Sequence, residues 1–214
     1  MHVENTAYLH SNPQRWEKTK NTLRPDFLLR GLPMSSRLLA FSGSLRQESF
    51  NTQLVFLAAD MAESRGAVVT RLKLQDLNLP MFDEDHEAAC GLPAGAKQLK
   101  DLMRSHDGFL ISTPEYNGFM SGALKNAIDW ATRPEEGHPP LDCFSGKLAG
   151  IMAASPGGLG GIRGLPMLRL LLSNIGVNVV GTQYALGHAE AGMQDGTAEK
   201  GVQKVVNEVL RMAQ

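Results

Sequence analysis

Residues 37–51 have the sequence RLLAFSGSLRQESFN, and this stretch decides the fold. Residues 37–42 are a short apolar run that ends at Gly43, as expected of a buried strand. Residues 51–64 then place apolar side chains at helical spacing, and Gly66 ends that pattern. A buried strand that passes through a polar loop into a helix is typical of an α/β domain.

The rest of the chain repeats this alternation. The patterns predict further strands at 67–74, 108–112, 147–154 and 177–186, and further helices at 95–106, 121–132, 165–175 and 198–213. Residues 76–93 contain Pro80, Pro93 and the acidic residues Asp83, Glu84, Asp85 and Glu87, and are predicted to form an irregular solvated loop. The alternation predicts an α/β fold with a parallel sheet and helices on both faces.

Composition and charge exclude several classes of protein. The 214 residues carry a formal net charge of −1, which argues against binding of nucleic acid through bulk positive charge. Cys90 and Cys143 form neither a disulfide scaffold nor a zinc-ribbon pattern, and the six histidines lack metal-site spacing, so no metal site is predicted. Apolar runs stay short of the roughly 18 residues of a membrane helix. We therefore expect no nucleic-acid or membrane partner and a cytoplasmic location.

The N-terminal residues 1–33 are predicted to be an extension of the domain at 34–214. They are polar and lack the apolar centre and cleavage site of a signal peptide. Two interpretations stay open. The extension is either a flexible arm or an arm that docks on a partner subunit through Trp16 and Phe27.

The loop after the first strand has the composition of a phosphate site. In an open parallel sheet, ligands bind at the carboxyl ends of the strands. Here the loop leads into a helix N-terminus, and Ser44, Arg46, Ser49 and Asn51 supply hydroxyl, guanidinium and amide donors. The alternative is an ordinary turn in which Ser49 or Asn51 caps the helix.

The loop after the third predicted strand suits a flat polar ring. Residues 112–118 have the sequence STPEYNG, in which Pro114 stiffens the exit from the strand and Tyr116 offers an aromatic face for stacking. The backbone from Glu115 to Gly118 can present N–H and C=O groups to the edge of a heterocycle. The alternative is a turn that leads to a helix cap at Ser121.

The loop after the fourth predicted strand is rich in glycine. Residues 155–164 have the sequence SPGGLGGIRG, which lets a backbone with exposed amides lie close to a ligand. A floppy surface loop is the alternative. The sequence lacks GxxxxGK[ST], and the near match to GxGxxG at residues 158–163 ends in Arg163, so neither an ATPase nor an NAD-binding dehydrogenase is supported.

With these three loops, the chain from about residue 36 to residue 186 resembles the NADPH-dependent FMN reductase family of the flavodoxin-like superfamily. The motifs that carry the resemblance are GSLR at 43–46 with Ser49 and Asn51, PEYN at 114–117 with LKNAIDW at 124–130, and SPGG at 155–158. The resemblance implies a flavodoxin-like three-layer sandwich with a five-stranded parallel sheet of order 2-1-3-4-5. It also implies non-covalent FMN, NADPH as co-substrate, and a homodimer or homotetramer.

The resemblance further implies which residues hold the cofactor. Ser44, Arg46, Ser49 and Asn51 would bind the FMN phosphate, and the isoalloxazine ring would be bordered by Pro114, Glu115, Tyr116, Asn117, Ser155, Gly157 and Gly158. The flavin carries the chemistry, so no catalytic acid or base is predicted. For Arg163, attraction of the NADPH 2′-phosphate and a plain surface position both stay open.

The activity implied by the resemblance is transfer of two electrons from NADPH through FMN to a small acceptor. Quinones, free flavin, azo compounds and metal oxyanions are acceptors in the family, which also has an organoarsenical-oxidising branch. The alternative is a non-enzymatic electron carrier of the flavodoxin type, although a net charge near zero gives such a carrier little electrostatic steering.

Overall fold

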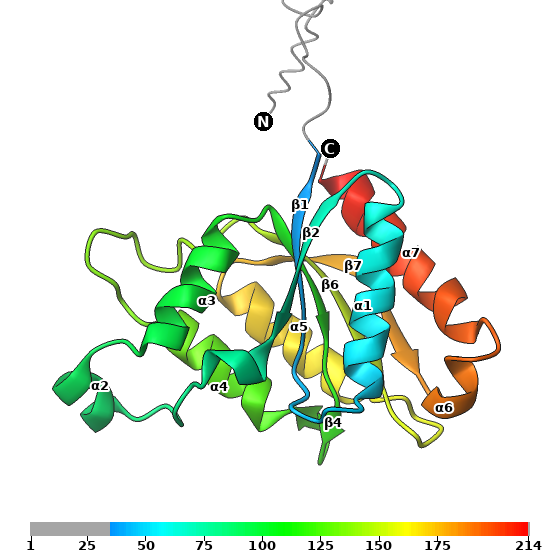
Figure 1. Cartoon of the computed structure of the whole chain (residues 1–214), viewed down its shortest axis with the longest axis horizontal. Coiled ribbons are helices and arrows are strands. Elements are labelled where there is room, and N and C mark those ends of the chain that lie inside the picture. The colour runs from blue at the N-terminus through cyan, green and yellow to red at the C-terminus, as the bar shows by residue number, and fades with distance from the viewer. Residues whose placement is uncertain (1–34, 214) are drawn as a thin grey trace, which may run out of the picture. The chain divides into compact units, whose positions relative to one another are not determined.

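The computed structural model describes residues 35–213. The extension predicted at 1–33, with Trp16 and Phe27, lies outside the described residues. The described part is a three-layer α/β sandwich (Figure 1).

Its central sheet has five strands, and all of them pair in parallel. They are β1 (Arg37–Ser42), β2 (Val68–Lys73), β3 (Gly108–Ser112), β6 (Leu148–Ala154) and β7 (Asn178–Leu186), in the spatial order β2-β1-β3-β6-β7. Two short strands form a separate hairpin. When the five strands of the central sheet are numbered by themselves in chain order, their spatial order is 2-1-3-4-5. The predicted fold and strand order are therefore confirmed.

Helices cover both faces of the sheet (Figure 1). On one face lie α1 (Phe50–Glu63) and α7 (Thr197–Met212), and on the other lie α3 (Ala94–Arg104), α4 (Gly122–Ala131) and α5 (Gly164–Asn174). Strand β1 contributes side chains to the core on both faces of the sheet. Leu38 and Ala40 belong to the core cluster under α1 and α7, whereas Leu39 and Phe41 belong to the cluster on the opposite face. Because alternate residues of β1 face opposite layers and both layers are apolar, residues 38–41 are all apolar.

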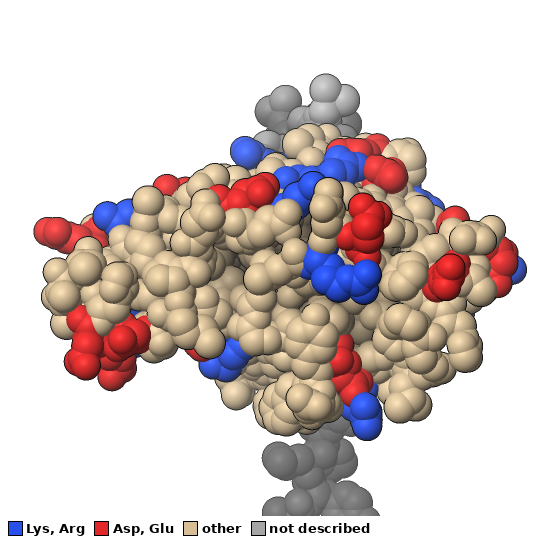
Figure 2. Space-filling view, turned by 60° about the horizontal axis from the view of Figure 1, so that its bottom comes forward, with Lys and Arg blue, Asp and Glu red and all other residues tan. Residues whose placement is uncertain are grey.

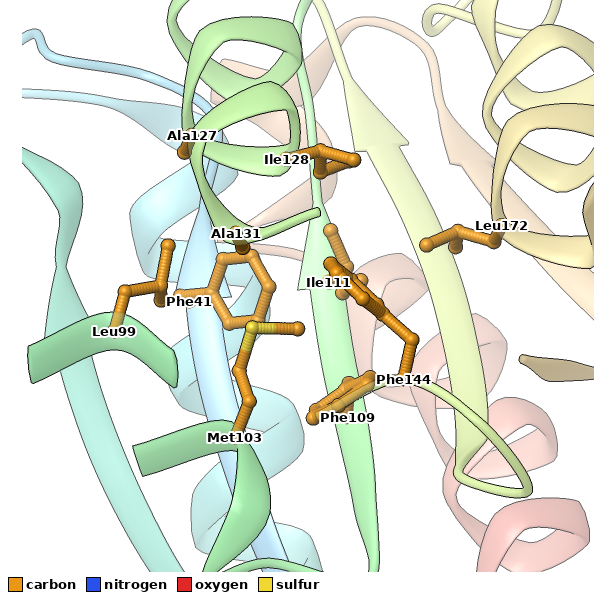
Figure 3. Close-up of a pocket in the computed structure, with 10 residues that line it drawn as sticks. All are labelled: Phe41, Leu99, Met103, Phe109, Ile111, Ala127, Ile128, Ala131, Phe144 and Leu172. Atoms are coloured by element: carbon orange, nitrogen blue, oxygen red, sulfur yellow. The ribbon is translucent and has the colours of Figure 1, made fainter. Parts of the chain in front are cut away.

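The core under α3, α4 and α5 is closed and apolar (Figure 3). It encloses a space of about 10 Å³ lined by Phe41, Leu99, Met103, Phe109, Ile111, Ala127, Ile128, Ala131, Phe144 and Leu172. A space of this size holds at most about one water molecule, and apolar walls give that water no partners. The core therefore offers no ligand site.

Three segments differ from the sequence-based prediction. Residues 76–93 are not wholly irregular, because η3 (Leu74–Leu77) extends into them and α2 (Glu84–Cys90) lies within them. Helix α2 begins where the Asp83 carboxylate accepts the N–H of Asp85 at 2.9 Å, and its acidic first turn complements the helix dipole. The hairpin β4 (Glu115–Tyr116) and β5 (Phe119–Met120), and the short helix α6 (Ala189–Gly192), were not predicted.

Across the described residues, no helix has the length and apolar content needed to cross a membrane.

Candidate functional site

The three predicted loops lie at one end of the sheet, where β1, β3 and β6 end, at the bottom of Figure 1. The first two loops touch at Gly43. Its N–H donates to Ser112 O at 2.8 Å, and its carbonyl accepts from Ser121 Oγ at 2.5 Å. A Cβ atom at position 43 would lie 2.8 Å from Leu124 Cβ, so glycine is required for this close approach.

The β1–α1 loop presents an open helix N-terminus. Ser49 caps α1 by accepting the N–H of Thr52, as one of the two interpretations of this loop required. Within the described residues, the backbone N–H groups of Phe50 and Asn51 have no acceptor, and the exposed Arg46 side chain forms no ion pair. The cap therefore satisfies one of the amides at the start of α1 and leaves others free, so both interpretations of this loop remain compatible with the structure.

Asn51 has a role that the sequence did not indicate. Its buried amide donates to Ala154 O at 2.9 Å, and Oδ1 accepts from Ser112 Oγ at 2.8 Å and from Ala154 N at 2.9 Å. The side chain therefore joins the ends of β3 and β6 beneath the loops. Its side-chain amide is therefore engaged within the protein, and only its backbone N–H is left free among the described residues at the start of α1.

The loop after β3 is a hairpin. Asn117 and Gly118 form its two-residue turn with φ of 55° and 86°, the left-handed conformations that this tight turn needs. Tyr116 and Phe119 pair across the hairpin and are 53% and 58% exposed. The Asn-Gly dipeptide between apolar residues was the sequence signal for this hairpin.

Glu115 links the hairpin to the glycine-rich loop. Its carboxylate accepts from Arg163 Nε at 2.6 Å, from Arg163 N at 2.9 Å and from Gly164 N at 3.2 Å, at the start of α5. Burial alone would raise the pKa of Glu115, but these hydrogen bonds and the Arg163 charge outweigh burial and hold the pKa below its ordinary value. Glu115 is thus ionised at neutral pH and caps α5 from a distant part of the chain.

The glycines of the third loop serve packing as well as backbone exposure. Gly160 has φ of 63°, and a Cβ there would lie 2.6 Å from Gly187 N. A Cβ on Gly187 would in turn lie 2.4 Å from Gly158 O. Ser155 Oγ accepts the N–H of Gly157 at 3.1 Å. The loop is therefore packed against the β7–α6 connection, which argues against a floppy surface loop.

A hollow of about 640 Å³ opens between these elements. It is lined by Gly43, Leu45, Arg46, Leu79, Met81, Tyr116, Ser121, Gly122, Ala123 and Asn126. A second hollow of about 120 Å³ brings Ser44 and Arg46 beside Thr52 and Lys73. Of the predicted residues, Arg46 and Tyr116 thus share the large hollow, and Ser44 lines the small one. The other predicted residues line neither hollow, namely Ser49, Asn51, Pro114, Glu115, Asn117, Ser155, Gly157 and Gly158. Leu79, Met81 and Asn126 were not predicted as site residues.

Figure 2 turns this end of the molecule toward the viewer. Most of the face is uncharged, and an acidic cluster lies at the side where α2 is found. The site is therefore a largely neutral surface on which the exposed Arg46 supplies one positive charge, in a loop that also carries the exposed Glu48.

Comparison with known proteins agrees with this geometry. The model of the NADPH-dependent FMN reductase family matches residues 36–191. The chain is 37% identical over 139 residues to a probable NADPH:quinone oxidoreductase 2 of Oryza sativa, covering 64% of this chain and 64% of that protein. It is 40% identical over 139 residues to an NAD(P)H-dependent FMN reductase of Pseudomonas aeruginosa, covering 64% and 69%.

Among solved structures, the flavoenzyme NAD(P)H:(acceptor) oxidoreductase of Paracoccus denitrificans superposes with a TM-score of 0.64 at 27% identity. The match covers 82% of this chain and 98% of that one. The family model spans the sheet and all three loops at its carboxyl end. The chain therefore belongs to the NADPH-dependent FMN reductase family.

Proposed function

We propose that this protein is an FMN-dependent NAD(P)H oxidoreductase whose acceptor is a quinone or a similar small ring compound. Family membership implies FMN as cofactor and NAD(P)H as co-substrate. Relatives named as quinone reductases support the acceptor class, including one of Escherichia coli that is 37% identical over 142 residues.

The observation that carries this proposal is the open anion site beside a neutral, partly aromatic hollow. Within residues 35–213, the Arg46 guanidinium has no ion pair and the amides at the start of α1 have no acceptor, which suits a phosphate dianion with the Ser44 and Ser49 hydroxyls as neutral donors. Pro114, Glu115, Tyr116 and Asn117 would border the flavin ring on one side and Ser155, Gly157 and Gly158 on the other. These donors fit FMN, and a flavin without phosphate would leave Arg46 unused.

When bound, FMN supplies the hydride chemistry, and the protein binds, orients and tunes it. The balance is NADPH, one proton and a quinone giving NADP⁺ and a hydroquinone. Arg46 and the α1 amides hold the phosphate. The Glu115–Arg163 pair fixes the spacing of the hairpin and the glycine-rich loop. Of the two interpretations left open for Arg163, its pairing with Glu115 favours a structural position over attraction of the NADPH 2′-phosphate.

The test is an absorption spectrum of the protein after FMN addition and desalting, followed by NADPH without oxygen. Flavin bands that are retained and bleach with NADPH are expected. Bands that are retained but do not bleach would favour the alternative function, an electron carrier reduced by another protein. Bands lost on desalting, with no binding in a titration, would contradict the assignment of the three loops.

We also propose a homodimer or homotetramer in the cytoplasm. An interface at the third loop and α5 is supported by three exposed apolar side chains. They are Leu159 and Ile162 in the loop and Leu170 on α5. Sedimentation at several concentrations tests this part, and a monomer throughout would contradict it.

A further inference from the structure

A short segment between η3 and α2, Leu79–Phe82, forms one wall of the large hollow. We name it the 79–82 strap. Three hydrogen bonds hold it on α4. Asn126 Nδ2 donates to Pro80 O at 2.9 Å, Trp130 Nε1 donates to the same oxygen at 2.8 Å, and Asn126 Oδ1 accepts the N–H of Phe82 at 2.7 Å. Asn126 and Trp130 are four residues apart, so they lie on one side of the helix.

Side-chain packing fixes the same strap at its end. The Phe82 ring meets the buried Trp130 ring edge-on, with centroids 5.0 Å apart. The Arg133 guanidinium lies 5.2 Å from the Phe82 centroid and pairs with Glu87 of α2 at 2.8 Å. The strap is thus anchored by α4 on both sides of residue 81.

Met81 lies between the two anchored residues and is itself exposed. It is 76% exposed, the highest value among the large apolar side chains of the described residues, and it lines the hollow with Leu79 and Tyr116. A thioether on an unbranched chain adapts to flat ring surfaces of different shapes. Leu45 and Tyr116, which are 55% and 53% exposed, line the same hollow, and a group of exposed apolar side chains around a hollow is typical of a ligand-binding groove.

We propose that the 79–82 strap sets acceptor specificity, with Met81 and Leu79 packing on a flat, uncharged ring of naphthoquinone size. This rests on the proposed function. Asn126 and Trp130 are then positioning residues, which gives the LKNAIDW motif a purpose that cofactor binding alone does not explain. The exposed Glu84 and Asp85 of α2 follow the strap directly and disfavour anionic acceptors such as metal oxyanions.

The experiment compares Met81→Ala with the matched control Met212→Ala, which truncates another exposed methionine at the far end of α7 (Figure 1). Binding of 1,4-naphthoquinone to the oxidised, FMN-loaded protein is measured by calorimetry, and NADPH turnover with 1,4-naphthoquinone and with ferricyanide is measured in parallel. Met81→Ala is expected to weaken naphthoquinone binding and raise its KM by roughly tenfold, as for the loss of apolar contact in a pocket. Met212→Ala is expected to change neither activity, and the loss in Met81→Ala is expected to be clearly larger with 1,4-naphthoquinone than with ferricyanide.

Equal effects of the two variants, or no naphthoquinone binding by the wild-type protein, would overturn the role of the strap. Failure of the proposed function would give a different result, because the wild-type protein would then oxidise no NADPH with either acceptor. Calorimetry measures naphthoquinone binding independently of that turnover. Asn126→Asp provides the positioning test. It keeps the acceptor for Phe82 N–H but loses the donor to Pro80, so the naphthoquinone KM is expected to rise while the FMN dissociation constant does not. A fall in both FMN and naphthoquinone affinity would indicate a merely structural role.

Discussion

At the scale of single residues, Arg46 and Glu115 separate two kinds of contribution to the site. Arg46 is exposed and free of ion pairs within residues 35–213, so its charge is available to a ligand. Glu115 is nearly buried and fully engaged by Arg163 and Gly164, so its charge organises the protein itself. The sequence motifs predict both residues in the site, but they do not distinguish a residue that binds the ligand from one that organises the protein.

Arg46→Ala is expected to weaken FMN binding by about 1.5–3 kcal/mol, the usual range for a hydrogen bond to a charged group. Equilibrium titration of the flavin-free protein measures it. Arg46→Lys should recover part of the loss, because a lysine keeps the charge without the bidentate geometry. Arg65→Ala, at an exposed arginine beyond the other end of α1, is the control. Equal FMN affinity in Arg46→Ala and Arg65→Ala would remove Arg46 from the phosphate site.

Glu115→Gln is expected to loosen the glycine-rich loop, because the amide cannot accept all the hydrogen bonds that the carboxylate accepts. FMN should dissociate faster, and stability should fall by about 1 kcal/mol. Stopped-flow release of FMN and thermal melting measure the two effects. The exposed Glu136→Gln is the matched control. Identical release rates in both variants would contradict the positioning role of Glu115.

At the scale of elements, the long connection from α4 to β6 is held on α3 by charge. Arg104 of α3 pairs with Glu135 and with Asp142, the latter at 2.7 Å. The neighbouring ionisable groups are Lys100, Asp101, His138 and Lys147. Burial alone would raise the pKa values of Glu135 and Asp142, but hydrogen bonds and charge from Arg104 outweigh it, and both pKa values lie below their ordinary 4.5 and 3.8.

This cluster predicts acid sensitivity. Because the folded-state pKa values are depressed, the stabilisation is present above the ordinary carboxyl pKa values and is lost as pH falls through the folded-state values. Arg104→Met should therefore lower the free energy of unfolding near pH 7 and approach the wild type in acid. Denaturant titrations from pH 7 to pH 3 measure this. Arg71→Met, which breaks the more exposed pairs with Asp60 and Glu63, is the control and should change little. A pH-independent difference for Arg104→Met would contradict the prediction.

The elements that sequence analysis missed share a physical cause. The helix α2 is seven residues long and has no buried residue, so no apolar periodicity marked it. The hairpin has two residues per strand, too few to show alternation. Both were nevertheless indicated by local chemistry, namely the Asp83 cap and the Asn117-Gly118 turn. The five long strands and their helices were predicted because each carries an apolar run or an apolar periodicity over five or more residues.

At the scale of the whole molecule, FMN binding should stabilise the fold. A ligand at 100 times its dissociation constant adds about 2.7 kcal/mol, which corresponds to a rise in Tm of roughly 5–10 °C for a chain of this size. Riboflavin, which lacks the phosphate, should give a clearly smaller shift at equal concentration. Thermal melting with each compound measures this. Equal shifts would place the phosphate outside the β1–α1 loop, and absence of any FMN shift would contradict the cofactor site.

The sequence by itself determined the layer architecture, the strand order through the family resemblance, and the three loops at the carboxyl end of the sheet. The layers and the loops follow from local apolar periodicity and from loop composition, which can both be recognised within about 11–18 residues, whereas the strand order was implied only by the resemblance. The tertiary structure alone decided that Asn51 joins β3 to β6, that Glu115 holds Arg163, and that Asn126 and Trp130 hold the 79–82 strap. Each of these contacts joins residues more than 40 positions apart, and a hydrogen bond across that separation leaves no pattern in the sequence around either partner.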